Sequence, residues 1–182
     1  MSPNSSALPA ASAHSAPSAP SAPSPSPVRD RRRVLVSSVS SDSHTWNLVF
    51  LQLLLEEMGH EVFNAGACVP DELVLSECRR LRPDALVIST VNGHGALDGR
   101  RLITRLRREP DLRDLQVVIG GKLGVRGAGA GTHAPELLAA GFDAVFEDAA
   151  GTEEFRRYLG EAPVRRPAAA ARRTAPALAG AR

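Results

Sequence analysis

Short apolar runs alternate with longer amphipathic segments along most of this chain, and this alternation limits the folds that the chain can adopt. The apolar runs, which we expect to form strands, cover residues 33–39, 60–66, 84–90, 115–121 and 142–147. The segments that we expect to form helices cover residues 46–59, 70–81, 97–109, 132–141 and 151–160. Strands separated by helices pair in parallel through right-handed crossovers. Because runs such as ALVI and VVI are apolar throughout, we expect helices on both faces of the sheet.

Five such units favour an α/β fold of the flavodoxin-like (Rossmann-like) class, a doubly wound five-stranded parallel sheet with strand order 2-1-3-4-5. In this order the loops after strands 1, 3 and 4 meet at the carboxyl edge of the sheet, where ligands bind in such folds. These loops read SSDSHTWN, STVNGHG and GGKLGVRGAGAG, and they are longer and more polar than a connection requires. We therefore expect a ligand site at this edge.

The two ends of the chain differ in composition from the alternating region. Residues 1–28 consist mainly of Ser, Ala and Pro, and residues 161–182 are rich in Ala, Arg and Pro. Such segments cannot bury enough apolar surface to fold, so we predict two disordered tails around one domain at 29–160. Arginines cluster beside and within the tails, but aromatic side chains suited to base stacking are scarce, and we do not expect nucleic acid as a partner.

Cysteine content and hydropathy bear on the compartment of the protein. Cys68 and Cys78 lack the spacing of a metal site or of a disulfide framework, which fits a reducing cytoplasm. The first residues lack the charged start and apolar centre of a signal peptide, and no apolar run is long enough to span a bilayer. We therefore expect a cytoplasmic protein without a membrane partner.

The loop sequences argue against several ligands of α/β folds. The loop after strand 1 contains no glycine, so a G-x-G-x-x-G dinucleotide site is not expected there, and a P-loop is absent from the sequence. A phosphorylated receiver needs an acidic cluster after strand 1 and an aspartate at the end of strand 3, but this chain has Asp42 alone and then Ser89 and Thr90. A flavin needs stacking aromatic side chains that the later loops do not contain.

Asp42 and His44 are the most informative pair in the first loop. A carboxylate two residues before a histidine can accept the proton of one ring nitrogen, which fixes the tautomer and leaves the other nitrogen with an oriented lone pair. Such a nitrogen suits a metal ligand or a general base. No second His, Cys or carboxylate stands nearby at zinc spacing. A lone imidazole suits a metal that is already held by a macrocycle and needs only an axial ligand.

Together with the other loops, this pair resembles the cobalamin (vitamin B12)-binding domain family, whose members carry Asp-x-His-x-x-Gly, then Ser-x-Leu, then Gly-Gly. The positions that fall on these motifs are Asp42, His44 and Asn47, then Ser89, Thr90 and Val91, then Gly120 and Gly121. Within the family, the segments FNAG and PDEL (63–73) and GHGALD (93–98) most resemble the small subunit of glutamate mutase, also called methylaspartate mutase. The resemblance covers residues 33–160.

The resemblance implies roles for these loops around adenosylcobalamin. His44 would ligate cobalt in place of the cofactor's own dimethylbenzimidazole, and Asp42 would hydrogen-bond the distal ring nitrogen. The displaced nucleotide tail would enter a slot beside the sheet, where Gly120 and Gly121 permit close approach. The implied cofactor-binding residues are Ser41, Asp42, Ser43, His44, Thr45, Ser89, Thr90, Val91, Gly120, Gly121, Lys122, Leu123 and Gly124. His44 is the implied metal ligand, and no catalytic residue is implied.

We therefore predict the cobalamin-binding small subunit of an adenosylcobalamin-dependent carbon-skeleton mutase of the glutamate to 3-methylaspartate type. The chain would be the non-catalytic, cofactor-binding component of an isomerase, and its partner would be a large barrel-type catalytic subunit. Two other hypotheses stay open at this point. One is a stand-alone corrinoid sensor or carrier without mutase activity, and the other is a flavodoxin-like binding module with a vestigial site.

Two positions depart from the motifs of the family. Asn47 replaces the glycine of the first motif, where a side chain would crowd the nucleotide tail. We expect the backbone shape to survive there because asparagine tolerates a positive φ better than most residues do. Val91 replaces leucine in the second motif, which removes one methylene. Neither departure removes the axial ligand.

Overall fold

The structure is a computed structural model that describes residues 31–124, 133–147 and 151–161. These residues form an alternating series of strands and helices: β1 (Arg33–Ser37), α1 (Trp46–Glu57), β2 (Glu61–Asn64), α2 (Asp71–Leu81), β3 (Ala85–Thr90), α3 (Gly95–Arg108), β4 (Gln116–Gly121), α4 (Ala134–Ala140), β5 (Ala144–Glu147) and α5 (Gly151–Glu161). Their type and order are those predicted from the sequence. The tails predicted at 1–28 and 161–182 lie outside the described residues, except that Glu161 is the last residue of α5.

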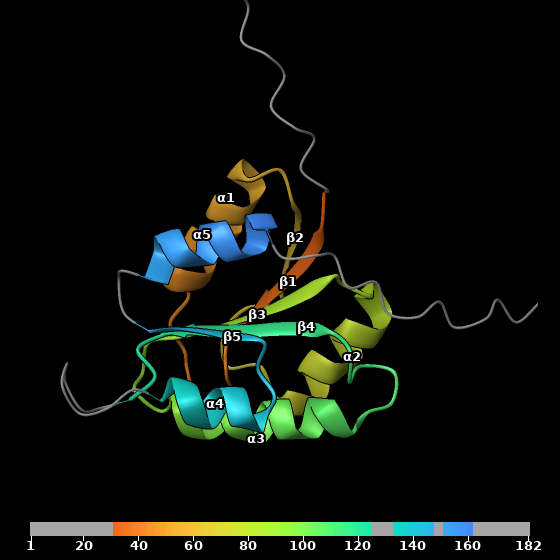
Figure 1. The fold of residues 1–182 in the computed structure, drawn as a ribbon, viewed down its shortest axis with the longest axis vertical. Coiled ribbons are helices and arrows are strands. Elements are labelled where there is room, and N and C mark those ends of the chain that lie inside the picture. Colours follow the sequence, from red (N-terminus) through yellow and green to blue (C-terminus); the bar gives the residue numbers. More distant parts are fainter. Residues whose placement is uncertain (1–30, 125–132, 148–150, 162–182) are drawn as a thin grey trace, which may run out of the picture.

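The strands form one parallel sheet in the order β2-β1-β3-β4-β5, which is the predicted flavodoxin-like order. Helices α1 and α5 lie over one face of the sheet, and α2, α3 and α4 lie over the other (Figure 1). The chain leaves β1 and β3 toward opposite faces. Their loops therefore diverge at the carboxyl edge, the place at which sheets of this topology bind ligands.

Successive side chains of the strands feed two hydrophobic cores. Val34 and Val36 of β1 pack with Leu55 of α1 on one face, whereas Leu35 packs with Leu102 of α3 on the other. Side chains alternate between the two faces of a strand, so a strand covered on both faces must be apolar at every position. This explains why the central strand β3 is buried along its whole length.

The start of α3 lies two residues before the predicted one. The sequence predicts a helix from Leu97, but the helix begins at Gly95. Ala96 N donates to the carbonyl of Leu123 (2.9 Å), which satisfies one of the amides that a helix leaves unpaired in its first turn. A contact with the loop after β4 therefore extends the helix toward the sheet edge.

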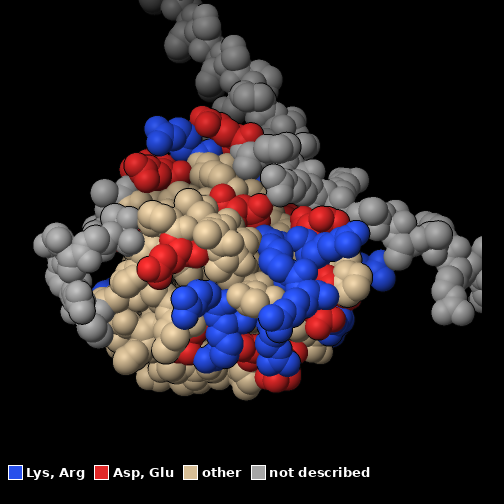
Figure 2. Space-filling model, turned by 60° about the horizontal axis from the view of Figure 1, so that its bottom comes forward, with Lys and Arg blue, Asp and Glu red and all other residues tan. Residues whose placement is uncertain are grey.

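The surface that α2 and α3 form carries many arginines, and carboxylates stand beside them. Figure 2 shows basic and acidic side chains close together on the lower side of the molecule in Figure 1. Arg79 pairs with Glu109 and Asp111, and Arg105 pairs with Glu72. Exposed pairs of this kind add little to stability, but they neutralise the positive charge locally.

Substitution of Gly121 by alanine, compared with the same substitution at Gly66, tests how much the sheet edge depends on close packing. Both have a positive φ, +104° and +89°, but a Cβ on Gly121 would lie 2.2 Å from the carbonyl oxygen of Thr90, whereas a Cβ on Gly66 would meet no atom within 4 Å. Gly66→Ala should therefore cost about 1 kcal/mol of unfolding free energy for the backbone strain alone. Gly121→Ala should cost at least about 2 kcal/mol more, because β3 and β4 must separate. Urea denaturation of both variants measures the difference, and equal losses would contradict this packing.

Candidate functional site

The loop after β1 folds back so that the side chain of Asp42 lies inside the protein. Asp42 N donates to the carbonyl of Val39 (3.1 Å), which closes a turn, and the carbonyl of Asp42 accepts from Cys68 N (2.8 Å) in the loop after β2. The Asp42 side chain has no exposed surface. Burial of an ionised carboxylate is costly unless its oxygens are hydrogen-bonded. The partners of this carboxylate are therefore decisive for the site.

The Asp42 carboxylate accepts hydrogen bonds from two loops. Oδ1 accepts from the backbone N of His44 (3.0 Å) and lies 2.6 Å from His44 Nδ1, and Oδ2 accepts from Val91 N (2.7 Å) just after β3. Burial raises the pKa of Asp42, but the hydrogen bonds from the His44 and Val91 backbone and from the His44 ring outweigh it and leave the pKa below its ordinary value. The carboxylate is therefore ionised at neutral pH.

His44 is held at one ring nitrogen and open at the other. Because an ionised carboxylate only accepts hydrogen bonds, Nδ1 carries the proton in the contact with Asp42, and Nε2 of the neutral ring keeps its lone pair. The His44 side chain is 48% exposed. Within the described part of the chain, no group hydrogen-bonds to Nε2. An oriented lone pair therefore stands at the carboxyl edge of the sheet and can serve as a metal ligand or a base.

Asn47 lies on the buried side of α1 and contacts the end of β3. It is the second residue of the helix and is 4% exposed, and its Nδ2 donates to Ser89 Oγ (2.8 Å). A positive φ at this position was the wrong expectation, because Asn47 has helical backbone geometry and does not appear among the positive-φ residues of the described chain. The size and polarity of the side chain are therefore what distinguish Asn47 from a glycine here.

Two buried oxygens near this edge have no hydrogen-bond partner among the described residues. They are Oδ1 of Asn47 and Oγ of Ser38, the residue that follows β1. A buried acceptor without a partner costs free energy, so most native structures satisfy such groups with protein, water or ligand. The edge of the sheet thus keeps unused hydrogen-bonding capacity beside Ser89.

Gly120 and Gly121 end β4 beside the end of β3, with Ser89 opposite Gly120 and Thr90 opposite Gly121. A Cβ on Gly120 would lie 2.9 Å from the carbonyl oxygen of Phe146 in β5, and a Cβ on Gly121 would meet Thr90. The space that a side chain would need at these positions is therefore filled by neighbouring strands. The strands themselves require both glycines, whatever a ligand requires.

The other residues predicted after β4 lie in different environments. Lys122 is exposed, Leu123 is buried in the core, and Gly124 packs against the ring of His133. The rest of this loop, including GAGAG (127–131), lies outside the described residues. The carbonyl of Leu123 accepts from Ala96 N in the first turn of α3, which fixes this residue of the segment.

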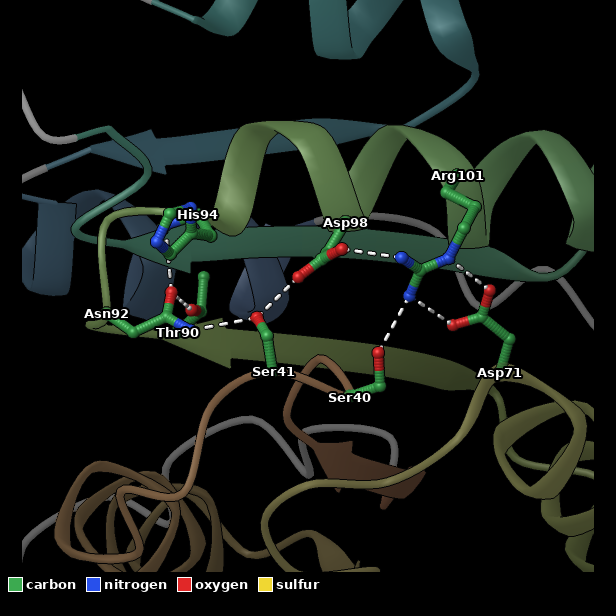
Figure 3. Close-up of polar contacts among 8 residues, drawn as sticks. All are labelled: Ser40, Ser41, Asp71, Thr90, Asn92, His94, Asp98 and Arg101. Carbon is green, nitrogen blue, oxygen red and sulfur yellow. Dashed lines mark hydrogen bonds and ion pairs between the residues drawn. The ribbon is translucent and has the colours of Figure 1, made fainter.

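A second polar network, which sequence analysis did not identify, joins the first loop to α2 and α3 (Figure 3). Arg101 donates from Nε (2.8 Å) and Nη2 (3.0 Å) to the carboxylate of Asp71, and from Nη1 to Asp98 (2.5 Å). Its Nη2 also donates to Ser40 Oγ (2.8 Å). The hydrogen bonds with Asp71 raise the pKa of Arg101 further above its ordinary value. The guanidinium therefore ties the start of the site loop to two helices.

The same network reaches the loop after β3. Ser41 Oγ donates to Asp98 and accepts from Asn92 Nδ2 (2.9 Å). The Oδ1 of Asn92 accepts from Thr90 Oγ1 (3.1 Å) and from the backbone N of His94 (2.9 Å). Asp98 is an acidic residue in the first turn of α3, and its carboxylate contacts Ser41 of the first loop and Arg101 of the same helix. Ser41 lies 57 residues before Asp98 in the chain, so no local sequence pattern indicates this contact.

The structure thus brings together most of the predicted loop residues, but it divides them among separate hydrogen-bonded groups. Asp42, His44 and Val91 share one carboxylate, and Ser41 and Thr90 meet through Asn92. Ser89 belongs to the separate contact with α1. The exposed residues Ser43 and Thr45 are the neighbours of His44 in the chain, and Thr45 precedes α1 without a side-chain capping bond.

An apolar stripe is exposed along α1, beginning two residues after His44. It consists of side chains that are between 48% and 64% exposed, namely Trp46, Val49, Phe50 and Leu53. Residues at this spacing share one face of a helix. Exposed contiguous apolar patches of this kind mark interaction surfaces more often than isolated apolar side chains do.

Residues 31–124, 133–147 and 151–161 contain neither a metal-binding cluster nor a membrane-spanning helix. No cluster of three or more His, Cys, Asp and Glu side chains suited to a metal ion occurs there. No helix in the same residues is long and apolar enough to cross a membrane. His44 therefore offers a metal a single protein ligand rather than a complete protein site.

Comparison with known proteins gives a family match over most of the chain. The sequence profile of the B12 binding domain matches residues 32–156. A glutamate mutase sigma subunit from Fusobacterium nucleatum subsp. nucleatum is 26% identical over 124 residues, which cover 68% of this chain and 90% of that protein. A glutamate mutase sigma subunit from Treponema denticola is 27% identical over 114 residues, 63% of this chain and 81% of that protein.

The fold is also found among solved structures. A cobalamin-binding protein from Desulfitobacterium hafniense DCB-2 superposes with a TM-score of 0.56 at 21% identity, over 71% of this chain, which spans only 60% of that protein. At this identity the likeness shows the fold alone.

Proposed function

The chain belongs to the B12-binding domain family, and we propose that it is the cobalamin-binding small subunit of an adenosylcobalamin-dependent carbon-skeleton mutase of the glutamate to 3-methylaspartate type. The observation that carries this proposal is the geometry of His44, whose Nδ1 lies 2.6 Å from the buried Asp42 carboxylate while its half-exposed ring presents Nε2 outward from the pair. The family match shows a cobalamin-binding domain; the ligand, the form of the cofactor and the reaction are our proposal.

The chemistry of His44 fits a lower axial ligand of cobalt. An imidazole that donates its other N–H to a carboxylate is a common ligand arrangement, because the carboxylate fixes the ring and raises the basicity of the free nitrogen. Asp42 is itself fixed by Val91 N, so the ligand is held by two loops. The proposed roles are therefore ligation by His44 and orientation by Asp42.

The residues around Ser89 fit a nucleotide tail if the bond between Asn47 and Ser89 opens or shifts. Ser89 offers a hydroxyl at the end of β3, and the two unpartnered oxygens near it give a tail further polar groups to bind. Asn47 already bonds to Ser89, however, where the glycine of the motif would leave space. We propose that the tail lies beside Ser89 and Val91 and that this bond opens or shifts to admit it.

Adenosylcobalamin supplies the radical chemistry of the rearrangement when it is bound, and the protein supplies ligation, orientation and exclusion of water. The described part of this chain brings no acid–base pair and no cluster of arginines to the ring of His44 that would hold a dicarboxylate substrate. We therefore place glutamate on a partner subunit of the barrel type.

The exposed apolar stripe on α1 supports the proposal of a partner subunit. The stripe begins beside His44, so a protein that covers it also covers the cobalt site. A catalytic subunit must meet the cofactor at this place in order to exclude water from the reaction. We propose that Trp46, Val49, Phe50 and Leu53 contact that subunit.

His44→Ala tests the proposed ligand. The full chain is titrated with adenosylcobalamin, and the visible spectrum of the bound cofactor is compared with that of His94→Ala, an exposed histidine at the same edge. His94→Ala should match the wild type. His44→Ala should lose the spectrum of nitrogen-ligated cobalt or bind at least about tenfold more weakly, because it removes the ligand. Identical spectra and affinities in all three proteins would contradict the assignment.

Leu53→Asp tests the proposed partner surface. Leu53 is 61% exposed on α1, and Leu138, which is 47% exposed on α4 over the opposite face of the sheet, provides a matched control. Leu53→Asp should lower the affinity for a large glutamate mutase subunit about tenfold or more. The aspartate carboxylate would lose its hydration at the interface, which is unfavourable. Conversion of glutamate to 3-methylaspartate should fall with assembly, and cobalamin binding by the chain alone should stay unchanged. An equal effect of Leu138→Asp, or no complex with the wild type, would argue for a carrier or sensor.

A further inference from the structure

Asn47 presents the clearest unexplained chemistry in the described chain. Its carboxamide lies in the row of α1 residues that face the sheet, where Leu54 and Leu55 follow about two turns later. Leu48, Leu54 and Leu55 are buried in the core cluster of this face, whereas Asn47, equally buried, is polar. A buried polar side chain in an apolar row needs partners for both ends of its amide.

Only one end of the Asn47 amide has a partner within the described residues. Nδ2 donates to Ser89 Oγ (2.8 Å), and Oδ1 is buried without a hydrogen bond. If the amide is turned round, Ser89 donates to Oδ1 and the orphan becomes the NH2 group. In either orientation one hydrogen-bonding group at this position is unused, and the unused group lies beside the serine at the end of β3.

The position of Asn47 relates this unused group to the nucleotide tail. The inference rests on the proposed function, in which the tail lies beside Ser89 and Val91. Asn47 stands at the glycine of the first motif and contacts Ser89 directly. A tail that reaches Ser89 therefore meets the Asn47 carboxamide. Whether the free amide group gains a hydrogen bond then depends on the base at the end of the tail.

Bases differ in what they can offer this amide. Dimethylbenzimidazole, joined to the ribose through one ring nitrogen, has no N–H donor, and methyl groups occupy its outer edge. Adenine has an exocyclic amine, which can donate to an amide oxygen, and ring nitrogens, which can accept from an amide NH2 group. Adenine can therefore satisfy the free end of Asn47 in both orientations of the amide. Dimethylbenzimidazole, whose remaining ring nitrogen only accepts, cannot donate to Oδ1 when Nδ2 is bonded to Ser89.

We propose that Asn47 is a specificity residue for the lower base of the cobamide, and that it selects a base with an exocyclic amine, such as adenine, over dimethylbenzimidazole. Sites built to hydrogen-bond a polar group discriminate strongly against an analogue that lacks it, because the buried protein group is then left unpaired. The motif has a glycine at this position, which leaves space for the tail. In this chain Asn47 would instead hydrogen-bond to the base.

The test compares two corrinoids that differ only in the base. The full chain is titrated with hydroxocobalamin and with the hydroxo form of the adenine cobamide, and binding is followed by quenching of Trp46, the single tryptophan of the chain, which lies next to Asn47. The wild type should bind the adenine cobamide at least about tenfold more tightly. Asn47→Gly, which restores the motif, should remove this preference and strengthen binding of hydroxocobalamin.

Asn47→Ala serves as a second variant, because glycine near the start of a helix lowers stability. Alanine also removes the amide, and it should abolish the preference without the backbone effect. A wild type that binds both corrinoids equally or prefers hydroxocobalamin would overturn the inference, as would a preference that survives in both variants. If His44-dependent binding is intact in those cases, the proposed function stands. Failure of the wild type to bind either corrinoid would overturn both.

Discussion

The buried carboxylate of Asp42 is the group on which the geometry of the site depends. It accepts hydrogen bonds from the backbone and ring of His44 and from Val91 N, and the carbonyl of the same residue accepts from Cys68 N. One residue therefore ties together the loops after β1, β2 and β3. Because an uncompensated buried charge costs several kcal/mol, these loops cannot move apart independently while Asp42 is ionised. The orientation of the His44 ring is a consequence of this constraint.

The two ends of the site differ in how complete they are. At the His44 end, each group that orients the ring has its partners, and the Arg101 network with Asp71 and Asp98 supports the same loop from behind. At the Ser89 end, the Asn47 side chain bonds across to β3 and leaves one of its own atoms unpaired. In the function that we propose, the preformed His44 end would hold cobalt, and the incomplete Ser89 end would select the nucleotide tail.

Local pattern was sufficient to predict the fold, but it predicted only part of the site. Apolar runs such as 84–90 are readable because burial on both faces demands apolar residues throughout, and the strand order followed from five repeated units. The Asp42–His44 contact was predictable because two residues of separation bring the groups together. The contacts of Arg101 with Asp71 and of Asn47 with Ser89 were not, since these pairs are 30 and 42 residues apart and meet only through the packing of helices on the sheet. For Asn47, reasoning from backbone tolerance failed because the residue is helical and its side chain, not its φ, is what matters.

Electron paramagnetic resonance of the cob(II)alamin form bound to the full chain tests the central claim most directly. The protein is made with ¹⁵N-labelled histidine, and the unlabelled cofactor is added. If a histidine is the lower ligand, the nuclear spin of ¹⁵N splits each high-field cobalt line into a doublet, and His44→Ala abolishes this splitting. Triplets that persist in the labelled protein would mean that the ¹⁴N of dimethylbenzimidazole still occupies the lower position, and the account given for His44 would be wrong.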